Sequence, residues 1–155
     1  MCLGLNPEGA EGLTASEVGR IEAKASALHR RSHLTTPSAW TLAPLASVRI
    51  ASIRRGLPVE GGGVFYHAKA AVFVRGDDER DDALGAAFAL ASAIVLQRGL
   101  PWSEVFRWRL AAELLVPGWA LADRGADPSV ATLPMAPAWL IEQARSRWLA
   151  DVANK

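Results

Sequence analysis

An uncharged and mostly apolar run of fifteen residues, Ala83 to Gln97, constrains the fold of this chain more than any other feature. Its apolar side chains would lie on every side of a helix rather than on one stripe, which is typical of a helix buried all round. The run is shorter than the roughly 18 apolar residues that a membrane-spanning helix needs. We therefore expect a core helix over 83–98, and no membrane span.

Three short segments before this helix have the composition of β-strands. Residues 48–54 alternate apolar and polar side chains, as a half-buried strand does. Residues 63–67 and 70–74 are separated by a tight turn near Ala68 and Lys69, a spacing that favours a hairpin. We expect these segments to form a small antiparallel three-stranded sheet that packs on the central helix, in an α+β domain.

Flanking helices are expected on both sides of this unit. Thr14 and Glu17 have the spacing of a capping box and should open a helix that runs to about residue 33. Its apolar residues recur three and four apart, so that one face packs inward. Those residues are Val18, Ile21, Ala25 and Leu28.

Two more helices are predicted after the central one. Ser103 can cap a helix that Pro117 and Gly118 end, and Pro137 can open a last helix to about residue 152. Residues 1–13 are rich in glycine and read as a flexible lead. A single domain is therefore expected over residues 14–155.

Composition limits the classes of protein to which the chain can belong. Half of its 155 residues are hydrophobic and 21% are charged, as in ordinary globular domains. Cys2 is the only cysteine, which excludes an internal disulfide and a cysteine-rich zinc site. Because no basic segment followed by an apolar stretch opens the chain, we expect no secretory signal and a cytoplasmic location.

The net charge of +1 is unevenly distributed along the chain. Residues 1–75 hold nine Lys/Arg and five Asp/Glu (9 − 5 = +4), whereas residues 76–155 hold eight and eleven (8 − 11 = −3). An excess of four charges over half a chain is weak support for nucleic acid, which calls for a clustered basic stripe. Nucleic acid is therefore not an expected partner.

Two segments resemble the core of the ImmA/IrrE family of small zinc-dependent peptidases. They are the central run and L-A-A-E-L-L-V-P, Leu110 to Pro117. The metal-binding helix of that family typically reads F-T-L-A-H-E-L-G-H, and its second helix ends in F-A-A-E-L-L-M-P. The order of elements is similar over about residues 45–150. This resemblance implies a zincin-like minimal fold.

The metal-binding residues of that family are absent from this chain. Ser92 and Leu96 stand where the two histidines would be, Ala93 where the general-base glutamate would be, and Phe106 where the third ligand falls. Catalytic zinc needs three ligands drawn from His, Cys, Asp and Glu, and the glutamate activates the attacking water. No histidine follows His67, so a shifted register cannot restore the set. We expect no metal, no other cofactor and no peptidase activity.

The leading hypothesis is a catalytically inactive relative of ImmA/IrrE peptidases that acts as a protein-binding or regulatory module. The resemblance implies a protein partner, such as a helix-turn-helix regulator of a phage or mobile element. Tryptophan and arginine are enriched among residues that dominate binding energy. Trp108, flanked by Arg107 and Arg109, is the expected exposed centre of a partner surface.

Two other function classes stay open. His29 and His33 are four apart and would share a helix face, with Glu17 or Glu22 as a third ligand, in a metal-dependent hydrolase with a non-standard ligand set. Two arginines between these histidines oppose a cation there. A small nucleic-acid-binding domain that uses the basic N-terminal half is the other class. The acidic residues at 77–82 are expected to be a solvated helix start.

Overall fold

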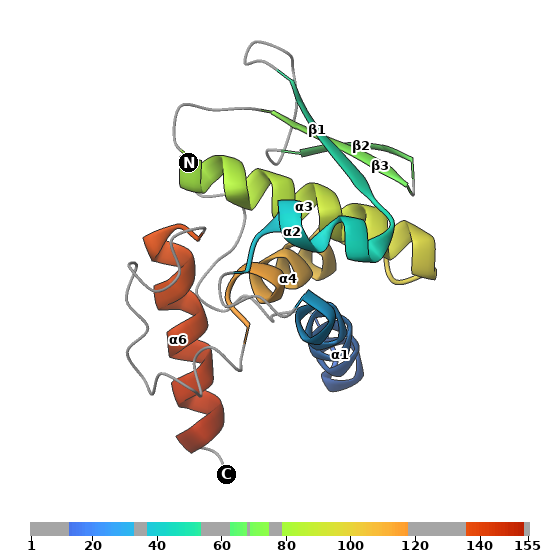
Figure 1. Cartoon of the computed structure of the whole chain (residues 1–155). Coiled ribbons are helices and arrows are strands. Elements are labelled where there is room, and N and C mark those ends of the chain that lie inside the picture. The colour runs from blue at the N-terminus through green and yellow to red at the C-terminus, as the bar shows by residue number, and fades with distance from the viewer. Residues whose placement is uncertain are drawn as a thin grey trace.

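The computed structural model describes residues 13–32, 37–53, 63–67, 69–74, 79–117 and 136–153. This part of the chain is predominantly helical, with one small sheet. The sheet lies on one side of the central helix, the other helices lie around its remaining sides, and α6 stands at the edge (Figure 1). The elements are α1 (Ala15–Ser32), α2 (Ala39–Leu42), η1 (Pro44–Ala46), β1 (Arg49–Ile53), β2 (Gly63–His67), β3 (Ala70–Val74), α3 (Glu79–Arg98), α4 (Glu104–Leu115) and α6 (Ala138–Ala153).

The central helix α3 is buried as its composition predicted. Every residue from Ala83 to Val95 is buried. Strands β2 and β3 pack on one side of α3, and α4 and α2 pack on others, so that no side of this stretch faces water. The helix ends at Gly99, whose φ of +62° lies in the left-handed region that glycine adopts without strain.

The sheet differs from the expected antiparallel one. Its order is β1-β3-β2, with β2 antiparallel to β3 but β1 parallel to β3. The parallel register runs from Arg49 opposite Ala70 to Ile53 opposite Val74. Three strands and the hairpin were predicted correctly, but an all-antiparallel sheet is wrong. Alternation identifies a strand without fixing the direction of its neighbour, and residues 54–69 are long enough for the crossover that parallel pairing needs.

The predicted capping box opens α1. The Thr14 backbone N–H donates to Glu17 Oε1 at 3.2 Å, and the Glu17 backbone N–H donates to Thr14 Oγ1 at 3.1 Å. Three of the four predicted apolar residues of this helix, Ile21, Ala25 and Leu28, are buried. The apolar face packs against α4, so the two helices share the core beneath α3.

The helices after α3 also follow the sequence pattern. Ser103 caps α4 by accepting a hydrogen bond from the Phe106 backbone N–H at 3.1 Å. Helix α6 buries Leu140, Ile141 and Ala144 in the common core. The predicted loop at 122–136 lies almost entirely outside the described residues, as do residues 1–12 of the predicted lead.

Candidate functional site

The four positions that correspond to the metal site of the peptidases lie on α3 and α4, but they do not share one environment. Ser92 is 1% exposed, and Ala93 and Phe106 are fully buried. Leu96, one turn after Ser92, is 46% exposed. The core helix expected over 83–98 is therefore buried only as far as Val95, because the end of α3 emerges from the core one turn earlier than its apolar sequence suggests.

The hydroxyl of Ser92 is engaged by the protein itself. Its O–H donates to the Phe88 carbonyl at 2.9 Å, the backbone bond that mid-helix serines commonly make. Its oxygen accepts from Arg107 Nη1 at 3.4 Å, a long hydrogen bond. Among the side chains that the structure describes, no histidine bonds to this hydroxyl to act as a base. The arrangement offers neither a nucleophile nor a metal ligand set at this point.

Arg107 is held in an unusual place for a cation. Its guanidinium carbon lies 4.0 Å from the ring centre of Trp102 and 5.1 Å from that of Phe88, so the group sits against two aromatic rings. Burial lowers the pKa of Arg107, and the nearby Glu104 carboxylate partly opposes that shift. The group stays charged at neutral pH because the pKa of an arginine guanidinium ordinarily lies far above neutrality. Within the described residues it forms no ion pair, and its Nε is buried without a hydrogen-bond partner.

Trp108 and Arg109 do not lie on the surface as expected. Trp108 is 1% exposed and stacks on Phe88 with ring centres 3.9 Å apart and planes inclined by 25°. Its Nε1–H donates to Glu104 Oε1 at 3.4 Å. Arg109 is 6% exposed. Of the three residues predicted to form a partner surface, only Arg107 is accessible, because α4 packs its other faces against α1 and α3.

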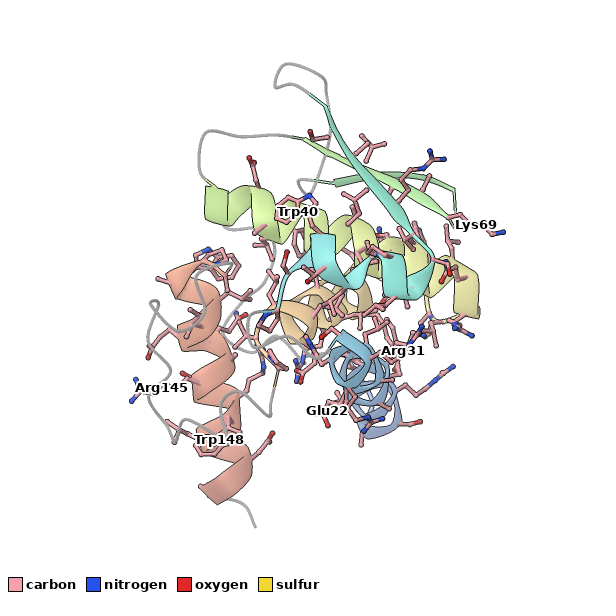
Figure 2. The ribbon with its side chains drawn as sticks, in the orientation of Figure 1. Glu22, Arg31, Trp40, Lys69, Arg145 and Trp148 are labelled. Atoms are coloured by element: carbon pink, nitrogen blue, oxygen red, sulfur yellow. The ribbon has the colours of Figure 1, made fainter. Side chains whose placement is uncertain are left out.

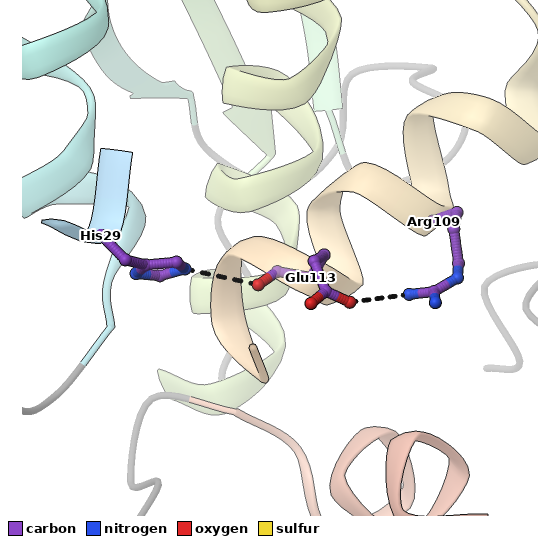
Figure 3. A network of polar contacts seen from close by, with 3 residues as sticks. All are labelled: His29, Arg109 and Glu113. Carbon is purple, nitrogen blue, oxygen red and sulfur yellow. Dashed lines mark hydrogen bonds and ion pairs between the residues drawn. The ribbon is translucent and has the colours of Figure 1, made fainter. Parts of the chain in front are cut away.

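Arg109 belongs to a buried polar network between α1 and α4 (Figure 3). Its Nη1 donates to Glu113 Oε2 at 2.9 Å, and the Glu113 backbone carbonyl lies 3.4 Å from His29 Nε2. Because a carbonyl can only accept, that nitrogen must carry the proton. Burial lowers the pKa of His29, although the bond to the carbonyl and the Glu113 charge act in the other direction.

Arg147 of α6 extends this network. Burial lowers its pKa to about 10, with the charge of Arg109 acting in the same direction, and Glu113 and Asp151 opposing it. His29 is thus a neutral, buried part of a structural network rather than an exposed ligand. His33, its proposed metal-binding partner, lies outside the described residues, as do the His67 side chain and the start of the acidic run at 77–82.

The described part of the chain contains no group of three His, Cys, Asp or Glu side chains placed to hold a metal ion. Nor does any helix in that part combine the length and apolar character needed to cross a membrane. Comparison of the chain with models of known protein families, with curated proteins and with solved structures finds no significant match in any of the three. The resemblance to ImmA/IrrE peptidases therefore stays a prediction.

Sequence reasoning missed the two aromatic residues that define the accessible site. Trp102 is 47% exposed in the connection between α3 and α4, and Phe88, which is buried against the Arg107 guanidinium, lies in the run that predicted only a core helix. The signal available was a tryptophan in the loop L-P-W-S, five residues before an arginine. That spacing brings the two together only because the loop folds back over the first turn of α4. We name Trp102, Arg107 and the exposed Leu96 the Trp102–Arg107 surface.

Proposed function

We propose that this chain is a non-catalytic binding module, a distant relative of the ImmA/IrrE peptidases, that docks a protein partner on the Trp102–Arg107 surface. The absence of chemistry is supported by the vestigial positions: Ser92 is bonded to the protein, Ala93 is fully buried, and neither is a metal ligand or a base. A docking role is supported by what lies beside them, an exposed tryptophan and an arginine without an ion pair among the described residues.

The state of Arg107 is the observation that carries the proposal. A guanidinium that is partly desolvated against aromatic rings attracts a carboxylate more strongly than one in water, because the effective dielectric constant is lower. Its Nε donor is buried and has no partner in the described structure. An acidic side chain on the partner can instead pair with the accessible part of the Arg107 guanidinium, since the residue as a whole is only partly buried, while an apolar side chain beside it covers Trp102 and Leu96. We expect a short segment that contains both.

The test is a selection of twelve-residue peptides from a random displayed library on the purified chain. Peptides that bind should share an Asp or Glu beside an apolar residue. Binding of the synthetic peptides, followed by fluorescence anisotropy, should weaken at least about tenfold for Trp102→Ala and for Arg107→Gln, the loss expected of binding hot spots. Arg107→Lys should also bind weakly, since it keeps the charge but lacks the planar group that stacks on the indole.

The matched control is Arg145→Gln, which removes a half-buried arginine from α6, at the far side of the molecule from α1 (Figure 2). Peptide binding should be unchanged in this variant. Replacing the peptide's acidic residue by its amide should cost affinity in the wild type but much less in Arg107→Gln, if the two groups contact each other. Selected peptides that bind Trp102→Ala and Arg107→Gln as tightly as wild type would overturn the assignment of this surface.

The hydrolase alternative has its own measurement. We expect the purified chain to hold no stoichiometric zinc by elemental analysis and to hydrolyse no peptide. About one zinc per chain, lost in the His29→Ala/His33→Ala double variant, would favour the hydrolase instead. His29 would then have to leave the Glu113 carbonyl, against which its Nε2 rests at 3.4 Å.

A further inference from the structure

The middle of the chain is almost free of acidic residues. Between Ala23 and Val59 there is no aspartate or glutamate. Residues 23–76 contain eight Lys/Arg and one acid, Glu60, which gives 8 − 1 = +7 in a chain whose total is +1. The whole-chain charge conceals this segment because the acids are concentrated elsewhere. The eight cations are Lys24, Arg30, Arg31, Arg49, Arg54, Arg55, Lys69 and Arg75.

Two hydrogen bonds bring the basic ends of α1 and α3 to the same place. Arg31 Nη1 donates to the Leu45 carbonyl at 2.9 Å, and Gln97 Nε2 donates to the next carbonyl, that of Ala46, also at 2.9 Å. Both carbonyls belong to η1. Arg98 follows Gln97 directly, and Lys24 lies on the same face of α1 as Arg31, two turns or about 10 Å away. Three cations thus lie around η1.

The start of the sheet continues this basic region. The Arg49 backbone N–H donates to the Lys69 carbonyl at 2.9 Å, which holds these two residues side by side just after η1. Arg31 and Lys69 lie on the same side of the molecule (Figure 2). We name this region the basic edge, and its members are Lys24, Arg31, Arg49, Lys69 and Arg98. Lys24 is partly exposed and the other four are exposed.

The cations of the basic edge are close enough to affect each other. The pKa of Lys24 is lowered first by burial and then by the charges of Arg98 and Arg31. Like charges that are close enough to lower the pKa of a lysine also cost folding free energy. A bound polyanion would offset that cost, because its negative charges would lie close to the cations.

We propose that the basic edge binds the sugar-phosphate backbone of a nucleic acid duplex without reading its base sequence. Three of its five cations are arginines, whose planar groups match phosphate oxygens in pairs. They project from two helices, a turn and a strand that η1 ties together, so the charges form a fixed array rather than a flexible tail. Phosphates spaced along a duplex can meet several members of such an array at once. This inference does not depend on the protein partner proposed above.

An anionic membrane is a less suitable partner for this surface. Membrane-surface segments combine cations with large apolar side chains that enter the acyl region. Of the exposed large apolar residues of the described chain, only Leu96 lies on an element that carries the basic edge; the others are Trp40, Trp102, Val105, Trp139 and Leu149. An acidic protein segment would supply carboxylates, but it would not supply their regular spacing.

The test is the binding of the full chain to a fluorescein-labelled 20-base-pair DNA duplex and its RNA counterpart, measured by anisotropy from 50 to 200 mM salt. Neutralisation of three to five phosphates predicts a log–log slope of about −2.7 to −4.5, which lowers affinity about 40- to 500-fold over that range. A Lys24→Gln/Arg98→Gln double variant should reduce the slope by about 2. Either duplex supports the proposal, and the tighter one identifies the natural class.

Arg145→Gln is again the control and should leave the slope unchanged. Circular dichroism should show that the double variant is folded, since both of its changes are at accessible positions. No duplex binding at 50 mM salt, or a slope that the double variant does not alter, would overturn the proposal. So would equal binding of poly-glutamate, which would indicate an acidic protein, or binding of phosphatidylserine vesicles without binding of either duplex.

Discussion

Introducing a carboxylate at position 93 tests whether the vestigial site is closed. Ala93 is fully buried on α3, at the position where the peptidases keep their general base. If the surroundings are as apolar and packed as the structure indicates, Ala93→Glu must fold with its carboxyl group protonated. If a water-filled cleft remained there, as in a working peptidase, the carboxylate would be solvated and the variant would lose little folding free energy.

The cost can be estimated from the burial of Ala93. Keeping a glutamic acid neutral at pH 7, when its ordinary pKa is about 4.3, requires roughly (7 − 4.3) × 1.36, or about 3.7 kcal/mol. Forcing the longer side chain into a filled core adds about 1–3 kcal/mol. The sum is a large part of the roughly 5–15 kcal/mol that stabilises a domain of this kind. Because the folded-state pKa is raised, the ionisation penalty is absent below about pH 4.3 and grows as pH rises.

Urea denaturation between pH 4.5 and 7 measures these contributions, relative to wild type at each pH. Ala93→Gln has the same shape without the ionisation, so its loss should be independent of pH and should isolate the packing cost. Leu96→Glu places the same carboxylate one turn away, at a position 46% exposed, and should cost less than about 1 kcal/mol. A loss for Ala93→Glu that is small and equal to that of Ala93→Gln at all pH values would show that position 93 faces water, and would refute the closed site.

Three further predictions follow from single contacts. His29→Gln should remove part of the pH dependence of stability. Because burial lowers the folded-state pKa of His29 below 6.5, wild-type stability falls as pH drops below about 6.5, by at most about 1.4 kcal/mol per pH unit. Urea titrations from pH 5 to 7 should show this fall in the wild type and a smaller one in the variant. Trp108→Ala should cost about 3–5 kcal/mol in the same assay, because the ring is buried, whereas Trp102→Ala should cost about 1 kcal/mol or less; similar losses would contradict the positions described for the two tryptophans. Ser103→Ala should lower the free energy of unfolding by about 1 kcal/mol, because the α4 cap is lost. Ser52→Ala, at an exposed position of β1, should leave it nearly unchanged.

The secondary structure could be predicted because it depends on local chemistry. The Thr14–Glu17 capping box, the Ser103 cap and the apolar run of α3 each fix an element within a few residues, and the structure places them there. The direction of β1 could not be predicted in this way. It depends on which edge of β3 is left open by the β2–β3 hairpin, and this is a property of the assembled sheet rather than of residues 48–54.

The accessible site was harder to predict because exposure depends on neighbours distant in sequence. Trp108 and Trp102 both lie beside charged or polar residues, yet Phe88 of the preceding helix covers the first and leaves the second open. The basic edge is a similar case. Its five cations span residues 24–98, and they are gathered by the hydrogen bonds to η1 and by the backbone bond between Arg49 and Lys69. A count of net charge cannot detect such a cluster when acids elsewhere balance it.

The basic edge also lies where backbone dipoles can offset repulsion among its cations. Arg31 is in the last turn of α1 and Arg98 is in the last turn of α3, at the negative ends of the two helix dipoles. Each such placement is worth about 0.3–1 kcal/mol. A carboxylate at the same place would pair with an arginine and occupy the N–H donors of its guanidinium. A helix end, by contrast, lowers the energy of the cation without neutralising its charge. Gathering cations at two helix ends therefore keeps their charge available to an anion from outside the chain.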